Sequence, residues 1–151
     1  MRQVMTFDEA FITGVAEIDD QHRNLISLTN EAGVMLQGNP RPAVVKNVVQ
    51  ELLSYAIYHF RTEEALMREY GYVERDRTAA DAHVQCHRSF SAQVVETQES
   101  LQRGDYVDSD ALLDFLSEWI RGHILGTDQH LAAFILAQRQ GGELTPASPV
   151  D

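Results

Sequence analysis

Residues 45–66 read VKNVVQELLSYAIYHFRTEEAL and carry the clearest structural signal in the chain. Apolar and ionisable residues recur there at steps of three and four: Val45, Val49, Leu52, Ala56, His59, Glu63 and Leu66. This spacing places all of them on one face of an α-helix. Because that face is mostly apolar, it is expected to pack into a core. The pattern therefore predicts a long helix, ended near Gly71, that carries His59 and Glu63 inward.

An extended arm, Met1–Ile18, is expected to precede the first helix. Asp19 or Asp20 can accept free amide protons as its N-cap. A helical apolar stripe follows, and the Gly and Pro residues of segment 38–42 end it.

Two further helices are predicted downstream. A polar connection, residues 74–78, leads into the third helix, and Ser109 or Asp110 can cap the fourth. The inward residues of the third helix are Ala80, His83, His87, Phe90, Val94 and Leu101. Those of the fourth are Leu112, Leu116, Trp119, His123 and Phe134. Four helices with short connections predict an all-α fold, an antiparallel up-down-up-down four-helix bundle with an extended N-terminal arm.

Length and composition predict one domain with a short tail. The chain has 151 residues, about the size of one ordinary domain. We expect residues 1–140 to form this domain. Residues 141–151 are rich in Gly, Pro and Ser and are expected to be a flexible tail or linker.

The charge balance argues against several partners. Twelve Lys and Arg against 23 Asp and Glu give a net charge of −11, which opposes binding to nucleic acid or to anionic membranes. No apolar run approaches the roughly 18 residues of a membrane span, and the N-terminus does not resemble a secretory signal. The single cysteine, Cys86, cannot form an internal disulfide. These features favour a cytoplasmic protein.

Ionisable side chains interrupt the inward faces of the helices. His59 and Glu63 lie on one, His83 and His87 on another, and His123 on a third. An unpaired buried polar group costs several kcal/mol, which a domain stable by roughly 5–15 kcal/mol tolerates poorly. A bound metal removes the difficulty, since imidazole and carboxylate groups are metal ligands.

Each residue alone has a simpler interpretation. A single histidine is more often a core or surface residue than a ligand, and His59 with Glu63 can be a hydrogen-bonded pair on one helix face. Histidines at i,i+4, such as His83 and His87, suit two ligands of one metal. Histidines from several helices at one layer of the bundle favour the metal site.

Asp128 follows His123 by five residues, which on an ideal helix turns it about 140° away. A local π-turn between the two residues would close that angle, and we expect one there.

The chain resembles the hemerythrin family, bacterial type. The resemblance runs from about Phe7 to Phe134. It is carried by Phe11–Val15, Ile18–His22, His59–Phe60, Glu63–Glu64, Leu66–Met67, Tyr70–Tyr72, His83, His87, Phe90, Trp119–Ile120, His123 and Asp128. The tryptophan often found in the family's N-terminal arm is missing, and Phe7 and Phe11 are expected to pack in its place.

The resemblance implies two non-heme iron ions with an oxo or hydroxo bridge. It assigns His22 and His59 to one iron and His83, His87 and His123 to the other. Glu63 and Asp128 are assigned to both irons. It also places Phe60, Trp119 and Ile120 in the apolar pocket around the ligand. Imidazole suits zinc, copper and nickel as well, so the choice of iron depends on the resemblance.

The function implied is reversible binding of dioxygen or another diatomic, not an enzymatic reaction. The iron held by two histidines has an open coordination position, as binding sites on metals require. The domain is expected to act as an oxygen- or redox-sensing input domain, with a C-terminal signalling output domain as its partner, or as an oxygen carrier. A di-iron oxidase or peroxidase, or an iron-handling protein, is the alternative. Such enzymes use more carboxylates.

Overall fold

The computed structural model describes residues 4–144, with side chains through residue 140. Within that range the chain forms helices and no strand, as the sequence predicts. The elements are the 3-10 helix η1 (Glu9–Phe11) and the α-helices α1 (Ala16–Met35), α2 (Pro42–Glu69), α3 (Tyr72–Arg75), α4 (Arg77–Gln102), α5 (Ser109–Leu125) and α6 (Thr127–Leu144).

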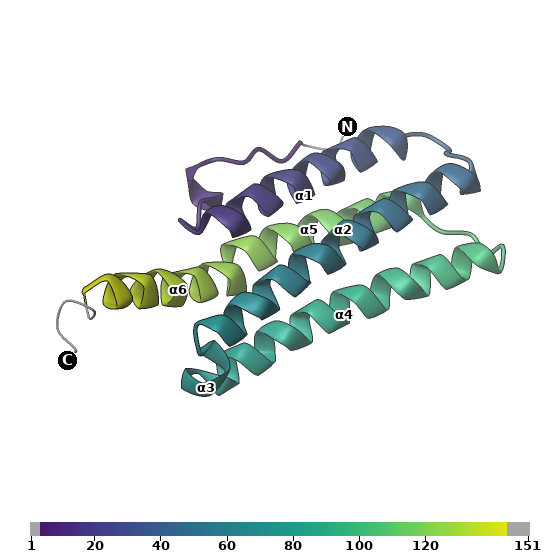
Figure 1. The fold of residues 1–151 in the computed structure, drawn as a ribbon. Helices are drawn as coiled ribbons and strands as arrows, with labels where there is room; N and C mark the ends of the chain where they lie inside the picture. Colours follow the sequence, from purple (N-terminus) through teal and green to yellow (C-terminus); the bar gives the residue numbers. More distant parts are fainter. Residues whose placement is uncertain (1–3, 145–151) are drawn as a thin grey trace.

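Four long helices, α1, α2, α4 and α5, lie side by side and alternate in direction (Figure 1). Helix α1 packs against α2 and α5, and α2 packs against α4. Large side chains fill the space between α4 and α5, where the rings of Phe90 and Phe115 stack with centroids 5.7 Å apart. The antiparallel up-down-up-down bundle is confirmed.

A polar layer lies between the two largest of the core's three apolar regions. Along α1, Ile18 belongs to one region and Leu25 to the other, with His22 between them. Along α4, Ala80 and Phe90 belong to the two regions, and the inward histidines of that helix lie between them. In both helices the polar side chains thus lie between the same two apolar regions, inside the bundle.

The N-cap predicted for α1 is wrong. The helix begins at Ala16, three residues before Asp19. The buried Asp19 carboxylate accepts hydrogen bonds from the Thr13 amide and hydroxyl and from the Gly14 amide, at 2.7–3.1 Å. Asp19 lies in the first turn of α1, and from there it holds in place the residues that lead into the helix.

Two other helix starts also differ from the prediction. The connection expected at 74–78 is mostly helical: Gly71, in the left-handed conformation (φ 75°), leads into α3, and Asp76 caps α4 by accepting from the Ala79 amide. Helix α5 is capped by Asp108, which accepts from the amides of Asp110 and Ala111, and not by Ser109 or Asp110. Carboxylates close to each other in sequence compete as caps, and spacing alone does not separate them.

The fourth helix is broken, and the π-turn expected between His123 and Asp128 is absent. Helix α5 keeps α-helical hydrogen bonding up to the Gly126 amide, which donates to the Gly122 carbonyl at 2.9 Å. Gly126 then leaves helical geometry (φ −110°, ψ −93°), and α6 starts at Thr127. This break redirects the chain and turns Asp128 inward, where it is fully buried.

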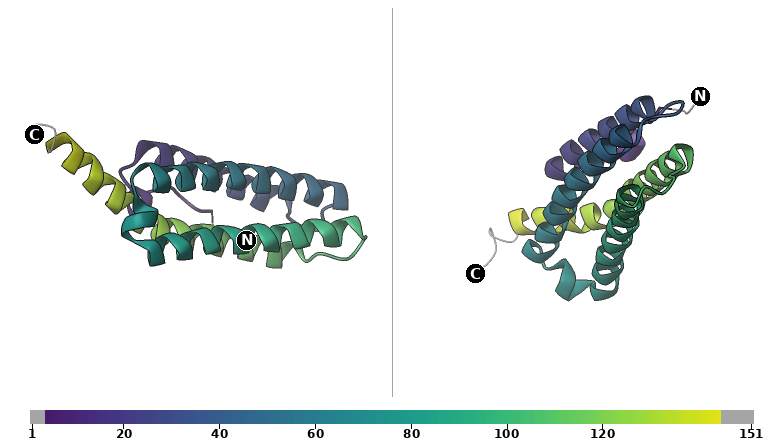
Figure 2. Two further views of the ribbon diagram at one scale, coloured as in Figure 1. Left: turned by 60° about the horizontal axis from the view of Figure 1, so that its bottom comes forward. Right: turned by 90° about the vertical axis from the view of Figure 1, so that its right-hand side faces the viewer.

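Helix α6 continues to Leu144 and extends past the other helices (Figure 2). The first residues of the predicted tail, 141–144, are therefore helical, while 145–151 lie outside the described residues. The division at residue 140 stays a prediction.

The N-terminal arm lies along α1. The Asn30 side chain donates to the Met5 carbonyl and accepts from the Met5 amide, at 2.8 and 3.0 Å. Phe7 stacks on Phe11 with centroids 6.0 Å apart, so these two rings pack as expected. Met5 and Phe11 are buried with Ile26, Ile120 and Ile124. The arm thus covers the junction of α1 and α5.

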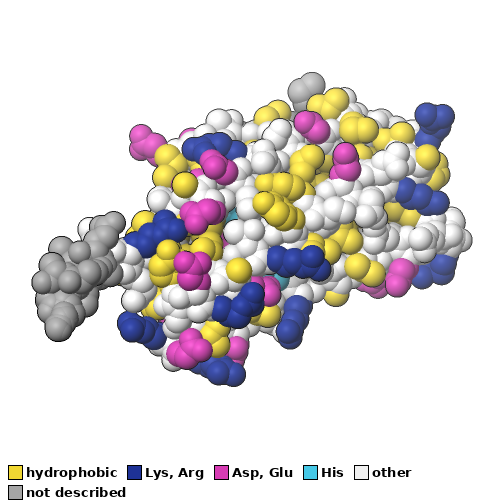
Figure 3. Space-filling model, in the orientation of Figure 1, with side chains coloured by type: hydrophobic (Ala, Val, Ile, Leu, Met, Phe, Trp, Pro, Cys, Tyr) yellow, Lys and Arg dark blue, Asp and Glu magenta, His cyan; other side chains and the backbone are white. Residues whose placement is uncertain are grey.

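Acidic and basic side chains are interspersed on the face shown in Figure 3. That face offers no continuous basic surface of the kind that binds nucleic acid. Among the described residues, no helix combines the length and the apolar character needed to span a bilayer.

Candidate metal centre

Seven side chains from five helices form the polar layer: His22 of α1, His59 and Glu63 of α2, His83 and His87 of α4, His123 of α5 and Asp128 of α6. None is more than 7% exposed. Their ligand atoms form two groups with metal-site spacing, one of five residues and one of four, with Glu63 and Asp128 in both. The structure thus brings together every metal-ligand residue predicted from the sequence.

The first group is built on three imidazole nitrogens. His123 Nε2 lies 3.2 Å from His83 Nε2 and 3.1 Å from His87 Nε2. Imidazole nitrogens about 2.1 Å from a shared metal, at right angles to one another, lie about 3.0 Å apart. These distances would allow the three histidines to bind one metal ion. We call this the three-histidine half.

The second group contains two imidazole nitrogens. His22 Nε2 is 2.7 Å from Asp128 Oδ2, and His59 Nε2 is 3.1 Å from Glu63 Oε2. The two rings meet edge to face, with centroids 4.7 Å apart. We call this the two-histidine half.

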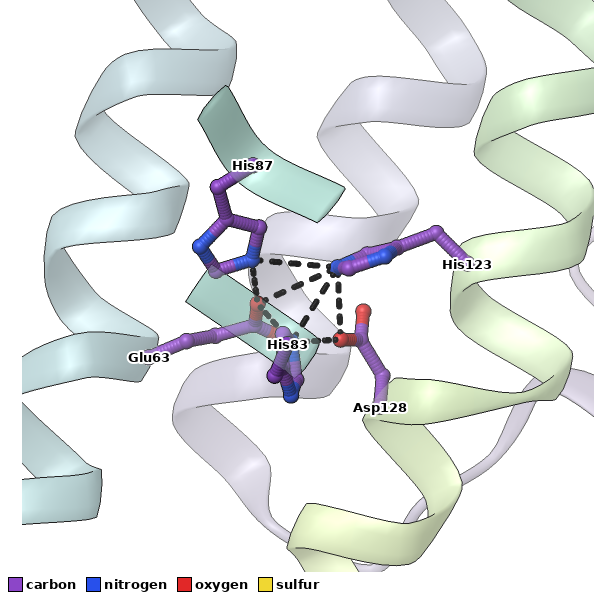
Figure 4. Close-up of side chains that lie close together, drawn as sticks. All are labelled: Glu63, His83, His87, His123 and Asp128. Carbon is purple, nitrogen blue, oxygen red and sulfur yellow. Dashed lines mark hydrogen bonds and ion pairs between the residues drawn. The ribbon is translucent and has the colours of Figure 1, made fainter. Parts of the chain in front are cut away.

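Each carboxylate presents a different oxygen to each half. Glu63 directs Oε1 at His87 Nε2, 2.9 Å away, while its Oε2 faces His59. Asp128 Oδ1 lies 2.9 Å from the Nε2 atoms of both His83 and His123, and its Oδ2 faces His22. Figure 4 shows both carboxylates between the helices, pointing at the three histidines. Each carboxylate could therefore offer one oxygen to a metal in each half.

The charges of the centre are strongly coupled. Burial disfavours the charged imidazolium, but Glu63 and Asp128 outweigh it and raise the pKa of His59, His83 and His123 to about 9. Burial also disfavours ionised carboxylates, yet the facing histidines hold the pKa of Glu63 and Asp128 well below the usual range. A metal that binds here must displace these protons.

Several buried polar atoms at the centre have no hydrogen-bond partner among the described residues. His59 Nε2, Glu63 Oε2 and Asp128 Oδ1 are close to opposite charges, but none is in hydrogen-bonding geometry. Buried polar atoms are normally satisfied, so such a concentration needs an explanation. A metal ion in each half would satisfy all three, and the donor set of nitrogen and oxygen atoms suits iron. The residues present therefore fit a di-iron centre.

Three of the five imidazoles have a partner at the outer nitrogen, Nδ1. That of His59 is 2.8 Å from Gln21 Oε1, and that of His123 is 2.9 Å from the Thr127 hydroxyl. Sequence reasoning assigned no role to either partner. The third partner is Glu64, whose Oε2 lies 2.8 Å from His87 Nδ1. The sequence signal for this contact was the position of Glu64, which directly follows the candidate ligand Glu63 on a helix that packs against α4.

Aromatic rings cover the three-histidine half. Phe60 stacks on His87, with centroids 4.0 Å apart and planes at 11°, and Trp119 stacks on His123 at 4.4 Å and 14°. Ile120 is buried in the neighbouring cluster under the N-terminal arm. Their assignment to the ligand pocket stays a prediction.

Two residues that are close to the ligands in sequence lie outside the centre. Cys86 is half-buried and belongs to neither metal-site group. His130 is exposed and contacts Asp76 at 3.1 Å.

The sequence model described as the hemerythrin HHE cation binding domain matches residues 13–135, a range that includes all seven candidate ligands. The chain belongs to the hemerythrin family. It is 35% identical to a bacteriohemerythrin of Stenotrophomonas maltophilia, covering 87% of this chain and 86% of that protein. It is 34% identical to one of Pseudomonas aeruginosa, with coverages of 77% and 71%. A crystal structure of wild-type hemerythrin matches the fold with a TM-score of 0.74 at 24% identity, covering 88% of this chain and 98% of that chain.

Proposed function

We propose that this hemerythrin-family chain binds two iron ions and takes up dioxygen, or another diatomic, reversibly. The observation that carries the proposal is the inequality of the two halves. Five residues offer ligand atoms to the first metal and four to the second, with both carboxylates shared. A solvent-derived bridge would complete six ligands on the first metal and leave one position open on the second. Open positions are where metal sites take small ligands.

When bound, the irons supply the electrons that dioxygen accepts. The chain's own residues hold the donors in place and exclude water. Every candidate ligand is at least 93% buried, since none exceeds 7% exposure. Phe60 and Trp119 keep the three-histidine half apolar by stacking on its imidazoles.

The direct test is anaerobic loading with Fe²⁺, exposure to dioxygen and removal of dioxygen, followed by absorption spectroscopy and metal analysis. We expect two irons per chain and a visible band that appears with dioxygen and disappears without it. A folded protein that takes up no iron, or one whose iron oxidises in a single irreversible step, would refute the proposal.

Binding, not catalysis, is the activity we infer. The centre has two carboxylates, whereas di-iron oxidases of helical bundles use a carboxylate-rich set. Fewer anionic ligands give less stabilisation to highly oxidised iron. Rapid peroxide-dependent oxidation of a phenolic substrate by the iron-loaded protein would contradict this.

A role in sensing is a second proposal, supported by α6. This helix carries Asp128 in its first turn, and its other end extends beyond the bundle (Figure 2). A shift of Asp128 on ligand binding would therefore move a helix that reaches solvent. Hydrogen exchange of α6 amides should differ between the reduced protein with and without dioxygen. Equal exchange in the two states would favour the carrier.

A further inference from the structure

The histidines of the centre differ in what their Nδ1 atoms contact. When Nε2 binds a metal, Nδ1 keeps the proton and donates it outward. The acceptor is a neutral amide oxygen for His59 and a hydroxyl for His123. His22 and His83 have no Nδ1 partner among the described residues. His87 alone faces a carboxylate there, that of Glu64.

The contact between His87 and Glu64 is well placed to act on the metal. The Nδ1–Oε2 distance is 2.8 Å, typical of a charge-assisted hydrogen bond. Phe60 stacks on the same imidazole and fixes its plane. The His87 ring is almost fully buried, while the Glu64 side chain is 31% exposed. Glu64 is thus a charged group at the edge of the bundle, joined to the buried centre through one ring.

We infer that Glu64 is a positioning residue that orients His87 and lowers the reduction potential of the three-histidine metal. The inference depends on the proposed di-iron function. A carboxylate that accepts the outer proton of a ligand histidine fixes its tautomer and makes the metal-bound nitrogen more basic. Its negative charge also favours the more oxidised metal, because the extra positive charge is attracted to it. The metal pair then gives up electrons to a diatomic more readily.

The test compares three variants with the wild-type chain. Glu64→Gln keeps an oxygen acceptor and removes the charge, and Glu64→Ala removes both. Glu69→Gln is the matched control, because it removes the same charge from an exposed position on α2 five residues away. We expect the midpoint potential of the iron-loaded protein to rise in Glu64→Gln and Glu64→Ala and to stay unchanged in Glu69→Gln. In Glu64→Ala, affinity for Co²⁺ should also fall by about 10-fold.

A second measurement needs no iron chemistry. In the Zn²⁺-loaded protein, the His87 Nδ1 proton should give a downfield, slowly exchanging NMR signal that moves upfield in Glu64→Gln and is lost in Glu64→Ala. Equal potentials in Glu64→Gln and Glu69→Gln, or an unchanged proton signal, would overturn the inference. Failure of the wild-type chain to bind iron would instead refute the proposed function. Because the zinc measurement needs no iron, it distinguishes failure of the inference about Glu64 from failure of the proposed function.

Discussion

The two halves of the centre differ in the contacts that support their imidazoles. In the three-histidine half, His87 is held by Phe60 on its face and Glu64 at its edge. His123 is held in the same way by Trp119 and Thr127. Ring stacking and hydrogen bonding together leave these imidazoles little freedom, which favours a permanent metal site.

The two-histidine half has fewer supports. Gln21 reaches His59, and it is itself held by the Thr62 hydroxyl at 3.1 Å. His22 has no Nδ1 partner among the described residues and leans edge-on against His59. The half with fewer protein ligands is thus also the half with looser support. We therefore expect the three-histidine half to retain its metal more tightly, and the two-histidine half to be where the small ligand binds.

Removal of one terminal ligand from each half should give the largest effects. We expect His22→Ala to reduce the metal content from two per chain to about one, because the three-histidine half keeps all its donors. His83→Ala should reduce it further, since it damages the better-supported site. Metal analysis after desalting measures both. Equal losses of metal in the two variants would contradict the proposed difference between the two halves.

A change at the break between α5 and α6 should disturb both halves through Asp128. A Cβ on Gly126 would lie 2.9 Å from the Gly122 carbonyl oxygen, so Gly126→Ala forces the backbone to move. We expect a destabilisation of about 1–3 kcal/mol and a lower content of both metals.

Gly122→Ala provides the control for this experiment. A Cβ there meets no atom within 4 Å, and the residue lies inside α5. The variant should keep its metals and gain up to about 1 kcal/mol from helix propensity. Denaturant unfolding of both metal-free variants measures the difference. Similar behaviour of the two would show that the break does not position Asp128.

A smaller effect is expected from loss of the Nδ1 acceptor that the described residues provide in the two-histidine half. Gln21→Leu leaves the His59 ring without its partner, and affinity for the second metal should fall by about 10-fold. Stepwise titration with Co²⁺ separates the two binding events. An equal decrease in both would mean that Gln21 supports the whole centre.

The metal-free protein should lose stability as the pH rises. The folded-state pKa of His59, His83 and His123 is about 9, against 6.5 as the ordinary value. Groups with a raised folded-state pKa stabilise fully below about pH 6.5, and this contribution is lost as the pH approaches 9. Glu63 and Asp128 remain ionised across that window, because their pKa values are lowered.

Metal binding should show the opposite dependence, since fewer protons compete for the ligands at higher pH. Urea unfolding at pH 6.5 and pH 9, with and without metal, measures both trends. A metal-free protein more stable at pH 9 than at pH 6.5 would contradict this account.

Much of the fold and of the centre could be predicted because helical periodicity is a local property. The spacing of His59 and Glu63, and of His83 and His87, fixes their common faces without knowledge of the partner helices. The place of Asp128 could not be derived in this way. It depends on a non-helical conformation at Gly126 that no spacing specifies.

The helix caps and the contacts of the outer histidine nitrogens were also harder to predict from spacing. Asp19 was expected at a helix end, but its carboxylate holds the preceding loop from inside the first turn. Glu64 is next to a ligand in sequence, yet its contact with His87 depends on the distance between α2 and α4. Such contacts follow from tertiary packing and not from the order of residues.

The most direct test of the account is anomalous diffraction at the iron edge from crystals of the iron-loaded protein soaked in azide. We expect two iron peaks, one surrounded by His83, His87 and His123 and one beside His22 and His59, with azide on the second. A single peak, or azide on the iron of the three-histidine half, would contradict it.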